Sequence, residues 1–201
     1  MYRQDTRNRV RIAQYANHFK ERGVFLRDEA TFLIDRLREH GIDFEVRWFK
    51  VRLLTVELVP QTCWFSNVRD HVSQDTWDFL RHATYRQANF TCEACGGRGE
   101  RWPVECHEIW HYDDQHHIQV LDGLMALCPS CHEVKHIGLA GVRGYGARAK
   151  AHLATVNGWS EAQTEAYLAE VWQTWHERSR YQWTLDLSWL AQYGITVSPK
   201  R

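Results

Sequence analysis

The chain has 201 residues, and its 25 lysine and arginine residues balance 25 aspartate and glutamate residues, so the formal net charge is zero. This length allows one domain with a sizeable core or a compact module with extended ends, and the balanced charge gives no argument for an anionic partner. Because the sequence has no run of about eighteen apolar residues and begins with the polar stretch MYRQDTRNRVRIAQY, we expect a cytoplasmic protein with no membrane partner.

Two helices and a strand are predicted in the first part of the chain. Apolar residues recur at helical spacing within residues 12–19, and again within residues 28–41, which are bounded by a capping aspartate and a terminating glycine. Residues 42–48 then alternate between apolar and charged side chains, as a strand with one buried face does. We group these elements as an N-terminal extension, residues 1–57.

The rest of the chain divides into a central module and a helical end. A helix is predicted at residues 77–85, just before the glycine-rich stretch NFTCEACGGRGERW. Near the end, Ser160 and Gln163 form a capping box, and the apolar stripe behind it indicates a helix that faces the core. The predicted divisions are a central module at 58–158, with its densest motifs at 90–138, and a C-terminal helical extension at 159–201.

Four of the six cysteines stand in two closely spaced pairs, Cys92-x-x-Cys95 and Cys128-x-x-Cys131. In a reducing compartment, cysteines are more often metal ligands or core residues than disulfide partners. Tetrahedral zinc favours four thiolates, and a gap of two residues lets both sulfurs of a pair turn toward one ion. We therefore predict one structural Zn²⁺ bound by these four residues, with an insert between the two pairs.

The second cysteine pair continues into two histidines in the stretch LCPSCHEVKH. His132 and His136 are four residues apart, so on a helix both rings project from one face, and such a pair is a common half-site for a divalent ion. The insert carries VECHEIW, and residues 120–127 are predicted to return as the second strand of a hairpin. If the helix lies across this hairpin, the two histidines face the strand that bears His107.

The stretches CEACGG, VECHEIW and LCPSCHEVKH, in this order, resemble the zinc-knuckle branch of the HNH endonucleases, within the ββα-metal or His-Me finger nucleases. The resemblance covers residues 90–138, and weaker similarity on either side is to phage and bacterial members. It implies an α+β fold in which a ββα metal-binding core is clamped by the four-cysteine zinc site and flanked by helices before and after. It also implies a hydrolase that cuts DNA with the help of a divalent metal.

The resemblance also implies roles for the hairpin and helix. In this family a strand histidine activates water, while a neighbouring strand residue and one or two helix residues hold a single divalent ion. The helix positions fall on His132 and His136. His132 takes the place of the asparagine that gives the family the middle letter of its name.

Two alignments of the strand stay open. Aligned on its single histidine, the strand has His107 as the base and Cys106 at the ligand position. Aligned on Ile109, it has His107 as a ligand and Glu108 as the base. We favour His107 as the base, because its ordinary pKa of about 6.5 suits proton removal at neutral pH. Glu105, two residues away on the same strand face, is then the first candidate for the third metal ligand.

Together these patterns predict a metal-dependent DNA endonuclease. The catalytic ion is expected to be Mg²⁺ or Mn²⁺, with Zn²⁺ or Ni²⁺ as alternatives. Basic residues on and after the helix are expected to neutralise neighbouring phosphates, namely Lys135, Arg143, Arg148 and Lys150. The alternative function is a catalytically silent, zinc-stabilised module that binds nucleic acid or a protein partner.

Overall fold

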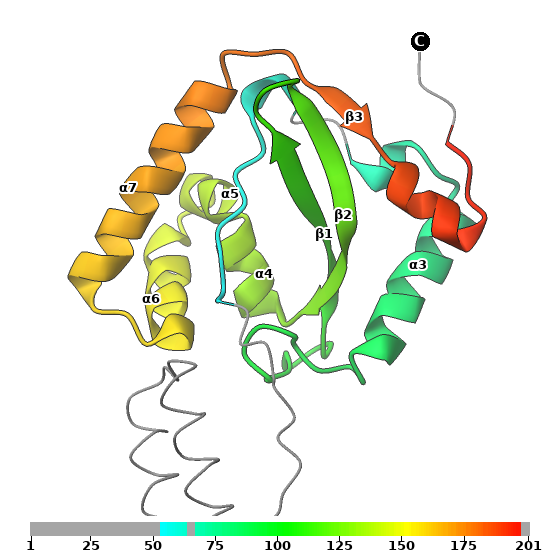
Figure 1. Ribbon diagram of the computed structural model, residues 1–201. Helices are drawn as coiled ribbons and strands as arrows, with labels where there is room; N and C mark the ends of the chain where they lie inside the picture. Colours follow the sequence, from blue (N-terminus) through cyan, green and yellow to red (C-terminus); the bar gives the residue numbers. More distant parts are fainter. Residues whose placement is uncertain (1–52, 64–66, 198–201) are drawn as a thin grey trace, which may run out of the picture. The chain divides into compact units, whose positions relative to one another are not determined.

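The computed structural model describes residues 53–63 and 67–197, which belong to a compact unit that begins at residue 52. These residues form an α+β fold with a three-stranded sheet at its centre and helices on both of its faces (Figure 1). The helices predicted at residues 12–19 and 28–41, and the strand predicted at residues 42–48, lie outside the described residues.

A β-hairpin and one short added strand make the sheet. Its strands, in spatial order, are β1 (Glu105–Asp113), β2 (Ile118–Leu127) and β3 (Thr184–Asp186). β1 pairs antiparallel with β2, with a bulge between Ile109 and Trp110, and β3 pairs parallel with β2. Among the described strands, β1 therefore lies at an edge of the sheet. The predicted second strand at residues 120–127 is confirmed.

Four helices follow the hairpin in the sequence. They are α4 (Pro129–Lys135), α5 (Ile137–Val142), α6 (Gly146–Asn157) and α7 (Glu161–Arg178). α4 packs directly on both hairpin strands, α6 packs on α4 and α5, and α7 packs on α6. The predicted capping box at the start of α7 is confirmed, because the Ser160 hydroxyl accepts from the Gln163 amide at 3.2 Å and the Gln163 side chain accepts from the Ser160 amide at 2.8 Å.

The opposite face of the sheet is covered by α3 (Gln74–Gln87) and by a 3-10 helix at Ser188–Tyr193. α3 confirms the helix predicted at residues 77–85, and it starts at Ser73, whose hydroxyl accepts from the Thr76 amide. Two further 3-10 helices, Gln61–Cys63 and Val68–Asp70, lie before α3. Within the described residues, no helix has both the length and the apolar character that a membrane span needs.

Two apolar clusters hold these layers together. The larger one lies between the hairpin and α4 to α7, and its fully buried members include Leu54, Leu127, Val134, Ala149 and Leu153. The smaller one joins α3 to the sheet and the final 3-10 helix through Val68, Trp77, Leu80, Leu121 and Leu190. The hairpin is therefore packed on both faces, which fixes the strand that carries His107.

An extended segment, residues 53–60, runs along the helices of the larger cluster (Figure 1). Asn157 of α6 bonds to both backbone groups of Leu54, at 2.9 and 2.8 Å. From α7, the Tyr167 hydroxyl accepts from the Val56 amide at 2.9 Å, and the Trp175 indole donates to the Val59 carbonyl at 2.9 Å. The predicted divisions at 57/58 and 158/159 both fall inside this packed unit.

Candidate metal centres

The four paired cysteines come together at one end of the hairpin. Cys92 and Cys95 lie in the turn after α3, whereas Cys128 and Cys131 lie at the start of α4. Their sulfur atoms are all within 4.8 Å of one another, and the sulfurs of Cys95 and Cys128 are 3.7 Å apart. The four are free thiols, and four sulfur donors at this spacing fit the tetrahedral coordination of a structural zinc ion.

Local backbone geometry shapes the first cysteine pair. Gly96 has φ of 73°, a left-handed conformation that glycine adopts easily, and its amide donates to the Cys92 carbonyl at 2.9 Å. Gly99 lies against the start of α4, where an added Cβ would be 2.4 Å from the Trp102 carbonyl oxygen and 2.6 Å from Pro129 Cδ. The glycines after Cys95 therefore let the first pair approach the second.

The thiols of this cluster differ in acidity, because burial raises the pKa of Cys95 to about 11 and the hydrogen bond with Cys92 raises that of Cys131. A hydrogen bond from Cys131 lowers the pKa of the Cys92 thiol to about 4. Cys131 is fully buried, and its sulfur lies 3.2 Å from Nε2 of His152 on α6. An N–H group at that distance can donate to a thiolate, in the way that outer groups orient metal ligands. The other two cysteines, Cys63 and Cys106, are buried elsewhere and take no part.

A second cluster unites three histidines from the hairpin and the helix. Ligand nitrogens of His107 on β1, His132 on α4 and His136 at the end of α4 lie within 4.8 Å of one another. The Nε2 atoms of His132 and His136 are 3.2 Å apart. The expectation that the helix histidines face the strand bearing His107 is confirmed, because α4 packs across the hairpin.

Burial favours the neutral form of two imidazole rings in this cluster. His107 is only 3% exposed, and burial lowers its pKa; burial also lowers the pKa of His136, to about 3. Both rings are therefore neutral near pH 7, and a neutral imidazole has the lone pair that a metal requires. Three nitrogen donors around one point fit a divalent transition metal better than Mg²⁺, which prefers oxygen ligands.

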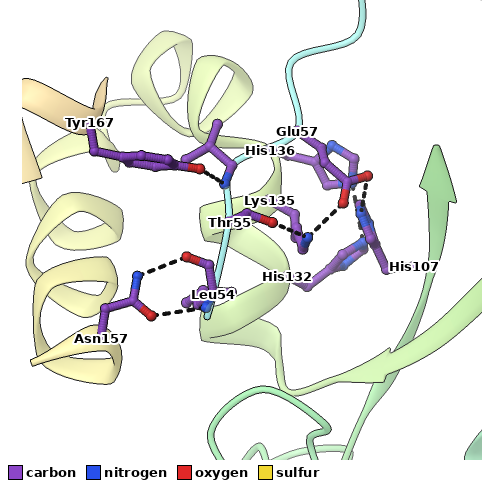
Figure 2. A network of polar contacts seen from close by, with 10 residues as sticks. Leu54, Thr55, Glu57, His107, His132, Lys135, His136, Asn157 and Tyr167 are labelled. Carbon is purple, nitrogen blue, oxygen red and sulfur yellow. Dashed lines mark hydrogen bonds and ion pairs between the residues drawn. The ribbon is translucent and has the colours of Figure 1, made fainter. Parts of the chain in front are cut away.

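Two of the rings are each bonded to a carboxylate, and Figure 2 shows the contact between Glu57 and His107. Nδ1 of His132 lies 2.5 Å from Glu105 Oε2, and this hydrogen bond lowers the pKa of Glu105. Nε2 of His107 lies 3.0 Å from Glu57 Oε2. We had expected Glu105 as the third ligand, but its carboxylate bonds to the outer nitrogen of His132, and the third histidine of the cluster is His107. Such carboxylates fix the tautomer and orientation of a metal-binding ring.

Glu57 was not predicted from the sequence. Its other oxygen accepts from the Lys135 ammonium at 2.6 Å, and Lys135 also donates to the Thr55 hydroxyl at 2.9 Å (Figure 2). Burial alone would raise the pKa of Glu57, but the bond to His107 and the charge of Lys135 lower it to about 2. The one sequence feature that could have indicated an acidic partner is Lys135, which lies between His132 and His136. A lysine in such a cluster can become buried, and a buried lysine requires a carboxylate partner.

The prediction that Lys135 contacts phosphate is corrected by its position. Lys135 is 5% exposed, and its ammonium is bonded to Glu57 and Thr55. Among the other predicted basic residues, Arg148 is paired with Glu133, and Lys150 is paired with Glu165. Arg143 is exposed at the end of α5. The stretch of positive charge in the sequence is therefore partly neutralised by acids on neighbouring helices.

The histidine cluster opens into a cavity of about 310 Å³. Glu108 also borders it, and its Oε1 accepts from the Val68 amide at 2.9 Å, while burial raises its pKa to about 7. The outer wall includes Asn67 and Arg69, which the sequence reading did not single out. Arg69 is exposed and lies 4.8 Å above the Trp77 ring. The cavity thus combines three imidazole rings, a half-buried carboxyl group and a cation.

Comparisons of the chain with protein-family models, with curated proteins and with solved structures found no match. The functional argument therefore depends on the residues and their geometry.

Proposed function

We propose that the protein is a metal-dependent endonuclease that hydrolyses phosphodiester bonds in DNA. The observation that carries the proposal is the cavity in which His107, His132 and His136 converge beside the half-buried carboxyl group of Glu108. A hairpin followed by a helix, with four cysteines close together, also supports the proposal, because this order is compatible with the one expected from the resemblance to HNH endonucleases. These features together support a nuclease more than a binding module, which has no need of a carboxyl group with a raised pKa beside a histidine cluster.

The three histidines would hold one divalent cation, and Glu57 and Glu105 would orient two of them. Such a cation supplies a Lewis acid that stabilises negative charge on phosphate oxygens. Because the donors are imidazole nitrogens, we expect Zn²⁺, Ni²⁺ or Mn²⁺ to support activity better than Mg²⁺. This order revises the sequence-based expectation, which placed Mg²⁺ and Mn²⁺ before Zn²⁺ and Ni²⁺.

Glu108 is the better candidate for the general base. His107 lies with the two helix histidines, so its ring is needed to complete the cluster. Glu108 is its neighbour on β1, an edge strand, and borders the same cavity. Its carboxylate would take a proton from the water that attacks phosphorus. This assignment corresponds to the alignment on Ile109 and not to the alignment that we favoured from the sequence.

Arg69 replaces Lys135 as the cation nearest to the substrate phosphate. Arg69 borders the cavity and is exposed, so its guanidinium would donate to phosphate oxygens in the forked geometry that arginine favours. Asn67 borders the same wall and offers a further polar contact. These two residues would position the substrate strand across the histidine cluster.

A plasmid-nicking assay tests the proposal. Zinc-loaded protein is incubated with supercoiled DNA and increasing Mg²⁺, Mn²⁺, Ni²⁺ or Zn²⁺, and we expect nicked or linear product with at least one of these ions. A His132→Ala/His136→Ala variant, purified identically, controls for contaminating nucleases. Failure of the wild type to cut duplex, single-stranded or branched DNA with every ion would favour the catalytically silent module instead.

A further inference from the structure

A second cavity of about 380 Å³ lies at the open end of the hairpin, between α3 and the turn that carries the first cysteine pair. We propose that it receives an unpaired nucleobase of a DNA strand whose backbone passes the histidine cluster. This inference relies on the proposed function for the choice of DNA as the ligand. It also narrows the DNA substrate to single-stranded, branched or locally opened sites, because only there is a base free to enter the cavity.

Aromatic rings from three separate segments line this cavity. Tyr85 belongs to α3, Phe90 follows the end of that helix, and Trp102 precedes β1. Phe90 is 43% exposed and Trp102 is 48% exposed, which is unusual for side chains of this size. Exposed rings that converge on one cavity form a stacking platform for bases, and stacking accepts any base because every base has a π-face.

The backbone at Phe90 supports a binding role for its ring. Asn89 has φ of 50° and Phe90 has φ of 53°, so two successive residues other than glycine adopt the left-handed conformation. The Phe90 amide donates to the Tyr85 carbonyl at 2.8 Å, and Arg98 donates to the Asn89 carbonyl at 2.9 Å. These bonds stabilise a turn that is otherwise unfavourable. In this turn the Phe90 ring is exposed at the cavity and is not buried in the core.

One side chain connects this cavity to the histidine cluster. The Trp102 indole donates to Glu105 Oε1 at 2.7 Å, and Glu105 Oε2 bonds to Nδ1 of His132 at 2.5 Å. Glu105 therefore borders the second cavity and also orients a candidate metal ligand. A base between Phe90 and Trp102 would lie beside the phosphodiester bond that the histidine cluster would act on.

The polar groups around the cavity suit a nucleotide. Arg81 and His82 border it from α3; Nε of Arg81 donates to Asp78 at 2.6 Å, which leaves its other guanidinium N–H groups and the His82 ring as hydrogen-bond donors near the rings. Arginine and aromatic rings together are the usual means by which proteins bind single strands without sequence preference. The chemistry around this cavity therefore matches a base with its attached phosphate.

The test measures binding separately from cleavage. Fluorescence anisotropy of the zinc-loaded protein, with no other divalent ion, compares three labelled probes: a thymine single strand, a strand of equal length with abasic sites, and a duplex. We expect the wild type to bind the thymine strand most tightly. Phe90→Ala should weaken this binding about 5- to 150-fold, the range that stacking of one base spans, and should remove the difference between thymine and abasic strands.

Two variants make the comparison specific. Phe79→Ala removes another exposed ring, 53% exposed, that lies on α3 outside the cavity, and it should bind all three probes as the wild type does. Trp102→Phe keeps a stacking ring but loses the bond to Glu105, so it should retain the preference for thymine. Equal wild-type affinity for thymine and abasic strands, an unchanged Phe90→Ala variant, or no binding to DNA would overturn the inference.

The two proposals fail in different ways. Binding that depends on bases, in a protein that never cleaves DNA, would retain the base cavity and reject the nuclease. Cleavage without any preference for bases would retain the nuclease and reject the base cavity.

Discussion

Glu57 and His107 are 50 residues apart in the sequence, and a hydrogen bond of 3.0 Å joins their side chains. The same carboxylate accepts from the buried ammonium of Lys135 at 2.6 Å. One acid thus orients a ring of the histidine cluster and also neutralises a lysine that burial would otherwise destabilise. The two effects can be separated by mutation.

Glu57→Gln should weaken metal binding at the histidine cluster about 10- to 100-fold, because glutamine can accept the same hydrogen bond but lacks the charge that makes the ring a stronger ligand. Calorimetric titration of zinc-loaded protein with Ni²⁺ measures this loss. Glu57→Gln also leaves Lys135 without a counter-charge, so Glu57→Gln/Lys135→Met serves as a second variant that removes both charges. We expect the double variant to recover thermal stability but not metal affinity. Glu165→Gln is the surface control, and a Glu57→Gln protein with wild-type Ni²⁺ affinity would contradict the prediction.

Cys92→Ala should bind no zinc at the cysteine cluster and should be poorly folded. Zinc binding at such sites contributes roughly 10–16 kcal/mol, more than the whole stability of a typical small domain. Metal analysis and thermal melting provide the two measurements. Cys63→Ala removes a buried thiol outside the cluster and should still contain one zinc ion. A soluble, metal-free Cys92→Ala protein that melts like the wild type would eliminate the zinc assignment.

Glu108→Gln should reduce the cleavage rate about 10²- to 10⁴-fold at every metal concentration, the usual range for loss of a general base. His107→Ala and His136→Ala should instead lose activity through weaker metal binding, so excess Mn²⁺ should restore part of it. Rate measurements over a range of Mn²⁺ distinguish a base from a ligand. The opposite pattern, with rescue of Glu108→Gln and none of His107→Ala, would return the role of base to His107.

Deprotonation of Glu108 should also lower the free energy of unfolding as the pH rises. Its pKa is raised from 4.5 to about 7 by burial, so between these values the folded protein binds more protons than the unfolded chain does. The free energy of unfolding therefore falls over this interval, and the loss is complete above pH 7. Glu108→Gln lacks this titrating group. The melting temperature of the variant minus that of the wild type should therefore increase between pH 5.5 and pH 8, when both are measured with no divalent ion added beyond the zinc at the cysteine cluster. A difference that does not vary with pH would contradict the raised pKa.

Arg69→Ala should weaken DNA binding and lower the slope of log affinity against log salt by about 0.9, the value for one lost phosphate contact on duplex DNA. Arg148→Ala is the matched control, because its guanidinium is already paired with Glu133. Filter binding at several salt concentrations measures both slopes. If the two variants behave alike, Arg69 has no special contact with the substrate.

The local parts of the candidate sites could be predicted from the sequence. Cysteines separated by two residues, and histidines separated by four, take fixed relative positions in a turn and in a helix, so both clusters were expected. Glu57 could not be predicted, because it reaches His107 through an extended segment whose position depends on α6 and α7. Lys135 was interpreted as a surface charge because only its sequence neighbours were visible, whereas its partners are residues 55 and 57.

The hydrogen bonds of the segment at residues 53–60 depend on residues that are synthesised about a hundred positions later. All four cysteines of the zinc cluster have been made once Cys131 is added, so zinc can bind while the rest of the chain is still on the ribosome. The segment that carries Glu57 depends on Tyr167 and Trp175, which are added much later. The growing chain can therefore gather its four cysteine ligands before it can fix the carboxylate behind His107, and the histidine cluster becomes complete only after nearly the whole protein has been translated.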